Sequence, residues 1–552
     1  MHAGISVRQR AAVLLVLCAS LLVVNLDSTI LNVALPTIVR DLHATSSQLQ
    51  WVLDAYAIVF AGLLLTLGSL GDRIGRRRVF AWGLALFAIG SAIAAFSSTP
   101  DRLIAARAFM GIGAAAIMPS TLSILTNVFV DDDSRAKAIG VWSGTTGVGI
   151  ALGPIVGGWL LAHYFWGSVF LVNVPIAFAA LVASIVVVPE SKNPSAPPLD
   201  PIGAVLSTLG LGILLWAIIE APSRGWRSWP ILVGTAIAFA ILVLFVLFER
   251  GSRHPMFDVS FFSSRRFSAA MAAMALVVFS LTGLLFLMTQ WLQFSLGYTP
   301  LATGLRTGPI ALVLIVVAPL SAVVARRIGT KLPVALGMLA IAVGLLLMSR
   351  MSVSSGYLGA VPALLLIGVG AGSAFAPATD AVMGSLPRTR AGVGSATNST
   401  ALQFGGALGV GVLGSLLNSR YQGQLAPVLA HYRVPISVTR VIEGSLGGAL
   451  AAGQHLGGAT GTALDSVARR AFSSGMDLTV LVGAVVSLVG VGVVLALLPN
   501  WAPAPLVPAP SASNFDLEIR PALQRHLTLV ADRAMGPPPD SDRYPGASTI
   551  SR

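Results

Sequence analysis

Three ionisable side chains interrupt long apolar stretches of this sequence: Asp27, Asp54 and Arg107. An ionisable group inside an apolar membrane span costs about 2.5 to 3.5 kcal/mol on insertion scales, so each of the three is a candidate for a functional role. A nearby guanidinium favours the charged form of a carboxylate, whereas burial disfavours it, so a carboxylate subject to both effects is suited to exchange protons as its exposure changes. The alternative is a static salt bridge between Asp54 and Arg107, since charges inside membranes commonly pair.

The composition indicates what surrounds these charges. Of the 552 residues, 55% are hydrophobic and only 10% are charged, and the mean hydropathy is +0.83. In soluble domains about a quarter of the residues are charged, so most of the surface of this protein must face lipid. The net charge of +13 does not indicate a nucleic-acid partner, because the arginines fall in short clusters and no basic stripe carries interleaved aromatic residues for stacking bases.

Apolar runs of about twenty residues, enough to cross a hydrocarbon core of about 30 Å, predict about fourteen transmembrane helices and an all-α membrane fold. Lys and Arg concentrate in the short loops on the side of the N-terminus, for example at Arg8, at Arg135 and within 73–78. Since positive residues remain in the cytoplasm, we expect both the N- and C-termini to be cytoplasmic.

The two ends of the chain resemble one another. GIGAAAIMP at Gly111–Pro119 is echoed by GVGAGSAFAP at Gly368–Pro377, with Leu364 at the position aligned with Arg107. The repeat is therefore symmetric in packing and asymmetric in charge, and our hypothesis is that any ion coupling resides in the N-terminal half. The two copies lie in the fourth and twelfth predicted spans, eight spans apart. Two six-helix bundles would place them six apart, so the offset predicts two inserted helices between the bundles.

This organisation gives the following expected segments. They are a cytoplasmic N-terminus at 1–10, an N-terminal bundle at 11–188, a cytoplasmic linker at 189–201, two inserted helices at 202–250, a C-terminal bundle at 251–500 with a long Gly-rich outer loop at about 418–475, and a disordered cytoplasmic tail at 501–552.

Two glycine-containing motifs have a direct physical reading. Gly149, Gly153 and Gly157 are spaced by four, so they share a helical face that lets another helix approach closely, and Pro154 bends the helix beside them. Gly158 completes this motif. The face is suited to sealing a pathway or to ordinary tight packing, and the sequence favours neither.

The second motif is GSLGDRIGRRR, Gly68–Arg78. Its glycines, Gly68 and Gly75 among them, permit a tight turn between helices. Its arginines, which include Arg73, Arg76 and Arg77, anchor the turn at the cytoplasmic interface. Asp72 is a carboxylate among these arginines and can form ion pairs that break when the two halves move.

Other chemistry is poorly supported. Cys18 is the only cysteine and the seven His residues avoid the centres of the predicted spans, so we expect no metal site. We find no cluster of catalytic groups at a span end, which disfavours an enzyme, and no GxxxxGK[ST] loop, which disfavours ATP hydrolysis. If the protein moves a solute against its gradient, an ion gradient remains as the energy source, and we expect no cofactor.

The motifs resemble those of the major facilitator superfamily, in its fourteen-helix drug:proton antiporter branch, over about 11–500. Gly68–Arg78 resembles the signature loop between helices 2 and 3, and LIAARAFMGIGAA at Leu103–Ala115 is similar to the intramembrane arginine motif, with Met110 where Gln is common. Gly149–Gly158 resembles the helix 5 motif associated with antiporters.

Two further segments complete the resemblance. LDSTILNVALP at Leu26–Pro36 is similar to the helix 1 motif of this branch. FWGSVFLVNVP at Phe165–Pro175 departs from the pattern, because Gly167 stands where an arginine is usual. This departure weakens an anchor at the lipid interface and leaves the resemblance intact.

The resemblance implies a proton-coupled antiporter that exports hydrophobic or cationic small molecules by alternating access, as multidrug efflux and antibiotic resistance proteins do. Asp27, Asp54 and Arg107 are then the proton-coupling residues, and Asp72 with its arginines is a conformational gate. The implied location is the bacterial cytoplasmic membrane, with protons, lipid and a lipophilic substrate as partners and a monomer as the expected state. A dedicated exporter of an endogenous metabolite or antibiotic, or an uptake symporter, is the alternative.

Overall fold

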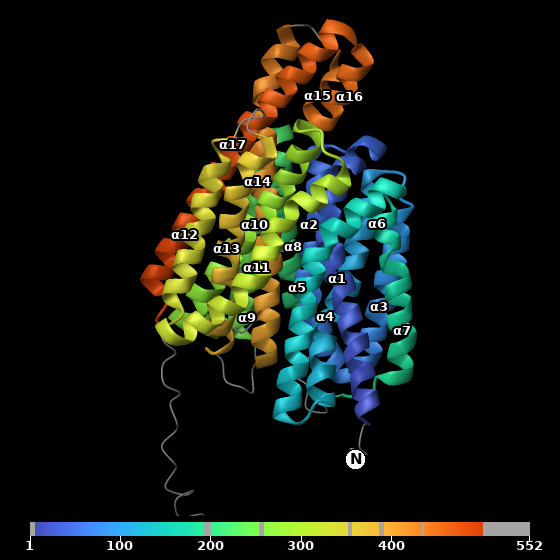
Figure 1. Ribbon diagram of the computed structural model, residues 1–552, viewed down its shortest axis with the longest axis vertical. Coiled ribbons are helices and arrows are strands. Elements are labelled where there is room, and N and C mark those ends of the chain that lie inside the picture. The colour runs from blue at the N-terminus through green and yellow to red at the C-terminus, as the bar shows by residue number, and fades with distance from the viewer. Residues whose placement is uncertain are drawn as a thin grey trace, which may run out of the picture. The chain divides into compact units, whose positions relative to one another are not determined.

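The computed structural model describes residues 6–192, 200–252, 259–351, 356–385, 391–431 and 435–500, and this part of the chain is helical with no strand (Figure 1). Thirteen of its helices are long and apolar enough to cross a membrane. Helix α5 (Asp132–His163), which bends by 41°, brings the number to fourteen when it is taken as one span. The prediction of an all-α membrane fold with about fourteen spans is therefore confirmed.

The N-terminal bundle consists of α1 (Val7–Leu42), α2 (Ser46–Ile74), α3 (Arg76–Ala95), α4 (Pro100–Val128), α5, the single turn α6 (Ser168–Leu171) and α7 (Asn173–Val187). Helices α1, α2, α4 and α5 each start at a side-chain cap. The Thr45 hydroxyl accepts from the Gln48 amide while the Gln48 side chain accepts from the Thr45 amide. Helix α4 packs against both α2 and α3, and α1 packs against α5 and α7.

The C-terminal bundle consists of α10 (Arg265–Gln290) with its π-helical end η2 (Trp291–Ser295), α11 (Pro300–Ile328), α12 (Lys331–Met348), α13 (Gly356–Met383), α14 (Ala391–His431) and α17 (Gly458–Leu497), preceded by the short turn η1 (Val259–Ser263). Helix α13 packs against α11 and α12 in the same way as α4 packs against α2 and α3. The repeated glycine motif accounts for this likeness, because both copies bring helix backbones close together.

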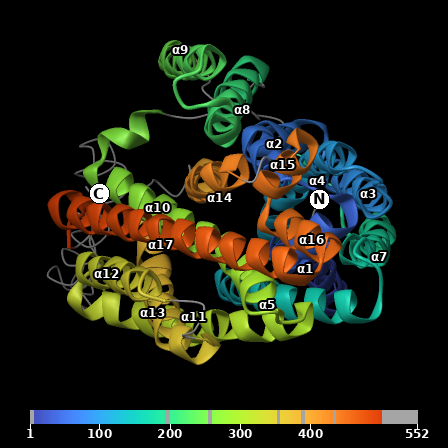
Figure 2. The same cartoon turned by 90° about the horizontal axis from the view of Figure 1, so that it is seen from above.

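The inserted pair is α8 (Pro201–Arg224) and α9 (Trp229–Gly251). Figure 2 shows both helices at the edge of the bundle, with α8 beside α2. Helix α8 contacts α2 in the N-terminal bundle and α14 in the C-terminal bundle, and α9 packs on α8. The insertion therefore lies over the line where α2 and α14 meet.

The structure corrects the loop expected at about 418–475. Helices α14 and α17 continue through this segment, and α15 (Ile436–Gly444) and α16 (Leu446–Leu456) lie between them. The segment buries apolar residues such as Leu446 and Ala449, and the Ser445 hydroxyl caps α16. Gly457, with a φ of +60°, separates α16 from α17. Figure 1 shows α15 and α16 at the end of the bundle away from the N-terminus. The expected tail at 501–552 lies outside the described residues.

The two bundles touch through backbone-to-backbone contacts and hydrogen bonds. Gly158 of α5 lies against the backbone of Leu301, and Gly304 of α11 lies against the backbone of Pro154. On α1, the Val33 carbonyl accepts a hydrogen bond of 2.8 Å from the Gln293 amide. These contacts lie toward the end of the bundle where α1 ends, which we call the closed end.

We predict that Gly158→Ile forces the closed end open, because a Cβ at Gly158 would lie 2.7 Å from the Leu301 Cα. Spin labels at the exposed residues Tyr164 and Leu358, in a Cys18→Ser background, would measure the separation of the two bundles there. We expect a longer distance in the variant than in the parent. Gly144→Ile is the matched control on the same helix, since a Cβ at Gly144 meets nothing within 4 Å.

Candidate functional site

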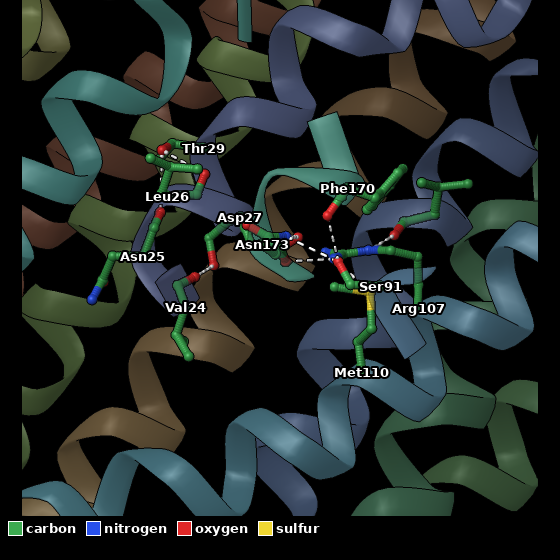
Figure 3. A network of polar contacts seen from close by, with 12 residues as sticks. Val24, Asn25, Leu26, Asp27, Thr29, Ser91, Arg107, Met110, Phe170 and Asn173 are labelled. Carbon is green, nitrogen blue, oxygen red and sulfur yellow. Dashed lines mark hydrogen bonds and ion pairs between the residues drawn. The ribbon is translucent and has the colours of Figure 1, made fainter. Parts of the chain in front are cut away.

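Asp27 and Arg107 form a buried ion pair between α1 and α4 (Figure 3). Arg107 Nη1 lies 2.6 Å from Asp27 Oδ2, and the side chains are 1% and 0% exposed. The Arg107 Nε donates to the Val52 carbonyl of α2 at 3.1 Å, and the guanidinium stacks 4.3 Å from the centre of the Tyr56 ring. Hydrogen bonds and a cation–π contact thus hold the arginine in place.

The second oxygen of Asp27 has a partner that the sequence did not indicate. Asn173, the first residue of α7, donates from Nδ2 to Asp27 Oδ1 at 3.0 Å and to the Ser91 hydroxyl of α3 at 3.1 Å. The Ser91 hydroxyl in turn donates to the Phe170 carbonyl at 2.9 Å. Asn173 lies in the Phe165–Pro175 motif, and membership of this motif is the only signal that the sequence offers for it. The sequence offers no signal for Ser91.

The alternative of a static Asp54–Arg107 bridge is wrong for this structure, because Arg107 pairs with Asp27. Helical geometry explains the outcome. Val52 and Tyr56 on α2 both contact Arg107, and Asp54 lies two residues from each, about 200° around the helix. Asp54 therefore faces away from α4, and the structure does not bring all three predicted charges together.

Asp54 lies instead where α2 meets α14 under α8. Its side chain is 1% exposed, and its Oδ2 makes no hydrogen bond among the described residues. A Cβ at Gly411 of α14 would lie 3.5 Å from this oxygen and 2.9 Å from Leu215 of α8. One turn away on α2, Gln50 lies close to Gly414 and accepts a hydrogen bond of 3.4 Å from the Ser415 hydroxyl. We call this region the α2–α14 seam.

The end of α2 and the start of α3, which only Gly75 separates, form ion pairs within the N-terminal bundle. Arg76 Nε lies 2.7 Å from Asp72 Oδ1, and Arg77 lies 3.7 Å from Glu190, which follows α7. Gly75 has a φ of +127°, and a Cβ there would lie 2.7 Å from the Glu190 carboxylate. Sequence reasoning missed Glu190. The role of Asp72 as a gate between the halves stays a prediction.

Two further members of this motif, Gly68 and Arg73, are at the end of α2. A Cβ at Gly68 would lie 3.1 Å from Pro119 of α4, so this glycine serves the packing of α2 on α4. Arg73 is in the last turn of α2, where a positive charge interacts favourably with the helix dipole.

The glycines of α5 divide between two partners. Gly149, Gly153 and Gly157 lie against α1, where added Cβ atoms would collide with Asn25, Thr29 and Ile30 respectively. Pro154 and Gly158 lie against α11, on the other bundle. The motif thus packs α5 on the helix that carries Asp27 and on the opposite half at the same time.

Comparisons with known proteins agree with this architecture. The family model described as Major Facilitator Superfamily matches residues 17–410. The chain belongs to the major facilitator superfamily. The predicted resemblance is therefore confirmed at the level of the superfamily.

Relatives within this superfamily are similar along most of the chain. The multidrug efflux pump LfrA of Mycolicibacterium smegmatis is 35% identical over 489 residues, covering 87% of this chain and 95% of that protein. The tetracenomycin C resistance and export protein of Streptomyces glaucescens is 35% identical over 491 residues, covering 87% and 90%. The methyl viologen resistance protein SmvA of Salmonella typhimurium is 32% identical over 402 residues, covering 73% and 81%.

A solved structure shares the fold. The bacterial homologue of the human lysosomal transporter Spinster, crystallised in an inward-facing and unoccupied conformation, matches with a TM-score of 0.63 at 19% identity, covering 90% of this chain and 100% of that one. As a major facilitator protein, the chain is a multi-pass membrane transporter of small molecules and not an enzyme. Efflux transporters of this superfamily use the proton gradient and need no cofactor.

We predict that Arg107→Gln lowers the free energy of unfolding by roughly 3 to 5 kcal/mol, since it leaves the Asp27 carboxylate buried without its cation. The double variant Asp27→Asn with Arg107→Gln removes both charges and should cost less than the single Arg107 variant. Denaturant titration of the detergent-solubilised protein measures both values.

Arg224→Gln is the matched control, because Arg224 is half exposed and pairs with Glu220 one turn away on α8. Its cost should stay below about 1 kcal/mol. An equal cost for the Arg224 and Arg107 variants would contradict a structural role for the buried pair.

Proposed function

We propose that this transporter is a proton-coupled antiporter that exports lipophilic, often cationic, small molecules by alternating access. The observation that carries the proposal is the buried Asp27 carboxylate, held between Arg107 and Asn173 inside the N-terminal bundle. A carboxylate in this position binds a proton or stays paired with the arginine, and either state changes how the helices around it pack. The names of the relatives above support efflux as the direction of transport.

The closed end supports a two-state cycle. Small residues and the side chain of Gln293 join the bundles there, with Gln293 bonded to the Val33 carbonyl and to the Arg40 guanidinium. No ion pair between carboxylate and cation joins the bundles at this end within the described residues, so the contact can separate without breaking a buried salt bridge. With the termini in the cytoplasm, as the distribution of Lys and Arg predicts, the closed end faces outward, which supports a state of the cycle that is closed to the outside. Both halves are in one chain, so a monomer contains the whole cycle.

Asp54 has a separate part in this cycle. Opening the closed end separates α2 from α14, which would expose the Asp54 carboxylate to the outside. We infer that Asp54 takes up a proton in that state and that Asp27 releases one to the cytoplasm after the bundles have returned. Protonation from outside favours release of a cationic substrate, because it removes a negative charge from the transport pathway.

Methyl viologen is a suitable first substrate to test, because it is a dication and the relative SmvA is a methyl viologen resistance protein. A dedicated exporter of one antibiotic is the second candidate, which the tetracenomycin C relative favours. A susceptibility panel in cells that overexpress the chain would separate the two. Increased tolerance to several unrelated cations indicates a multidrug pump, and increased tolerance to a single compound indicates a dedicated exporter.

We predict that Asp27→Asn abolishes proton-driven transport of methyl viologen in proteoliposomes, because the amide cannot exchange a proton. Transport should be followed together with the opposite movement of protons, using a pH-sensitive dye inside the vesicles. Normal proton-coupled efflux in this variant would show that the coupling role assigned to Asp27 is wrong.

We predict that Asp54→Asn weakens the dependence of export on outside pH, since Asp54 is the carboxylate that opening would expose first. The initial rate of export at several outside pH values is the measurement. Asp41→Asn is the control, because Asp41 is an exposed carboxylate in the last turn of α1, at the closed end. An unchanged pH profile in the Asp54 variant would leave Asp54 with a purely structural role.

A further inference from the structure

The hydrogen bonds around Asn173 have a fixed direction. Its Nδ2 lies 3.0 Å from Asp27 Oδ1 and 3.1 Å from the Ser91 hydroxyl, and that hydroxyl lies 2.9 Å from the Phe170 carbonyl (Figure 3). The side chains of Asp27, Ser91 and Asn173 are fully buried. Water therefore does not compete for these groups, and each hydrogen bond depends on the next.

The direction follows from the Phe170 carbonyl, which can only accept. Ser91 has one hydroxyl proton and donates it to this carbonyl, so the Ser91 oxygen is left to accept from Asn173. The NH₂ group of Asn173 must then face Ser91, and its second N–H points to Asp27. The Asn173 carbonyl oxygen makes no hydrogen bond within the described part of the chain, although it is buried.

An N–H donor stabilises a carboxylate and offers nothing to the proton of a carboxylic acid. We propose that Ser91 and Asn173 are positioning residues that keep Asp27 in its charged form, with Ser91 acting indirectly by orienting the Asn173 amide as a donor. Their effect on the protonation of Asp27 is independent of the proposed function, and their meaning for transport rests on it.

The same arrangement links protonation to a change at α6 and α7. A protonated Asp27 needs an acceptor, and the unused carbonyl oxygen of Asn173 becomes one only when the amide turns over against the orientation that Ser91 imposes, at the cost of the hydrogen bond from Ser91 to Phe170. Ser91 would then face this oxygen and donate to it, releasing the Phe170 carbonyl at the end of α6. Protonation of Asp27 thereby reaches the junction of α6 and α7 through two hydrogen bonds.

Other groups around Asp27 act in known directions. Arg107 of α4 pairs with the opposite carboxylate oxygen, and the Tyr56 ring of α2 lies against the Arg107 guanidinium. Helix α5 packs its glycines against α1, and η2 contacts α1 through the neutral side chain of Gln293. Because Arg107 also favours the charged form, its bond to Asp27 must stay intact in any test of Ser91 and Asn173.

Infrared spectroscopy of the reconstituted full chain can follow the carbonyl band of protonated Asp27 against pH, with Asp27→Asn identifying the band. We expect Asn173→Leu to move the midpoint of this titration upward by about one pH unit, the size of the charge-assisted hydrogen bond that it removes. Ser91→Ala should move it in the same direction by less, because it removes only the orientation of the Asn173 amide. The double variant should shift no further than Asn173→Leu alone, since Ser91 acts only through the amide.

The controls separate orientation from general damage. Ser184→Ala removes another buried hydroxyl, one that bonds to the Leu181 carbonyl of α7, and should leave the midpoint unchanged. Ser91→Thr retains a hydroxyl, so its midpoint should equal that of the parent. If Asn173→Leu does not fold, the comparison of Ser91→Thr with Ser91→Ala tests the proposal. An unshifted midpoint in Ser91→Ala, or additive shifts in the double variant, would overturn the proposal.

The result is distinguishable from a failure of the proposed function. If the midpoints shift as expected while Asp27→Asn still exchanges substrate for protons, then Ser91 and Asn173 control Asp27 and Asp27 does not couple transport. If Asp27→Asn uncouples transport while the midpoints do not move, the coupling role stands and the inference on Ser91 and Asn173 fails.

Discussion

A negative charge in the apolar interior of a bundle must be matched, and the N-terminal bundle is built around this requirement. Asp27 on α1 receives Arg107 from α4 and Asn173 from α7, while Arg107 also bonds to α2 and Asn173 to Ser91 on α3. Five helices thus meet at one carboxylate. Because removing any one partner leaves a buried group unsatisfied, the relative positions of these helices depend on whether Asp27 is charged.

The C-terminal bundle repeats the packing without the charge. Gly111 of α4 lies against the backbone of α2 and Gly113 against α3, and in the same way Gly368 of α13 lies against α11 and Gly370 against α12. At the position aligned with Arg107, the C-terminal bundle has the buried apolar Leu364. In the proposed cycle, protonation of Asp27 changes the interactions of the N-terminal bundle, and the aligned position of the C-terminal bundle has no ionisable side chain to respond.

The sequence predicted the features that depend on composition and spacing. Long apolar runs indicated the spans, the glycine repeat indicated two alike bundles, and rare intramembrane charges indicated Asp27 and Arg107. It could not predict which carboxylate pairs with Arg107, since this depends on the rotation of α2, which turns Asp54 toward α14. Asn173 and Ser91 could not be distinguished in the sequence because neutral polar residues are common in spans. Helices formed in the described parts of 418–475 because burial of apolar residues outweighed the cost of the glycines inside them.

The α2–α14 seam explains why the closed state need not be permanent. Closing it buries Asp54 Oδ2 and Gln50 Nε2 without hydrogen bonds from described residues, which costs free energy. Helix α8 offsets part of that cost, because Leu215 and Ile219 pack with Ile58 of α2 and Ala407 of α14 and exclude lipid from the carboxylate. In the proposed cycle, protonation of Asp54 removes the larger of these costs. The inserted helix α8 covers the seam that this cycle would open.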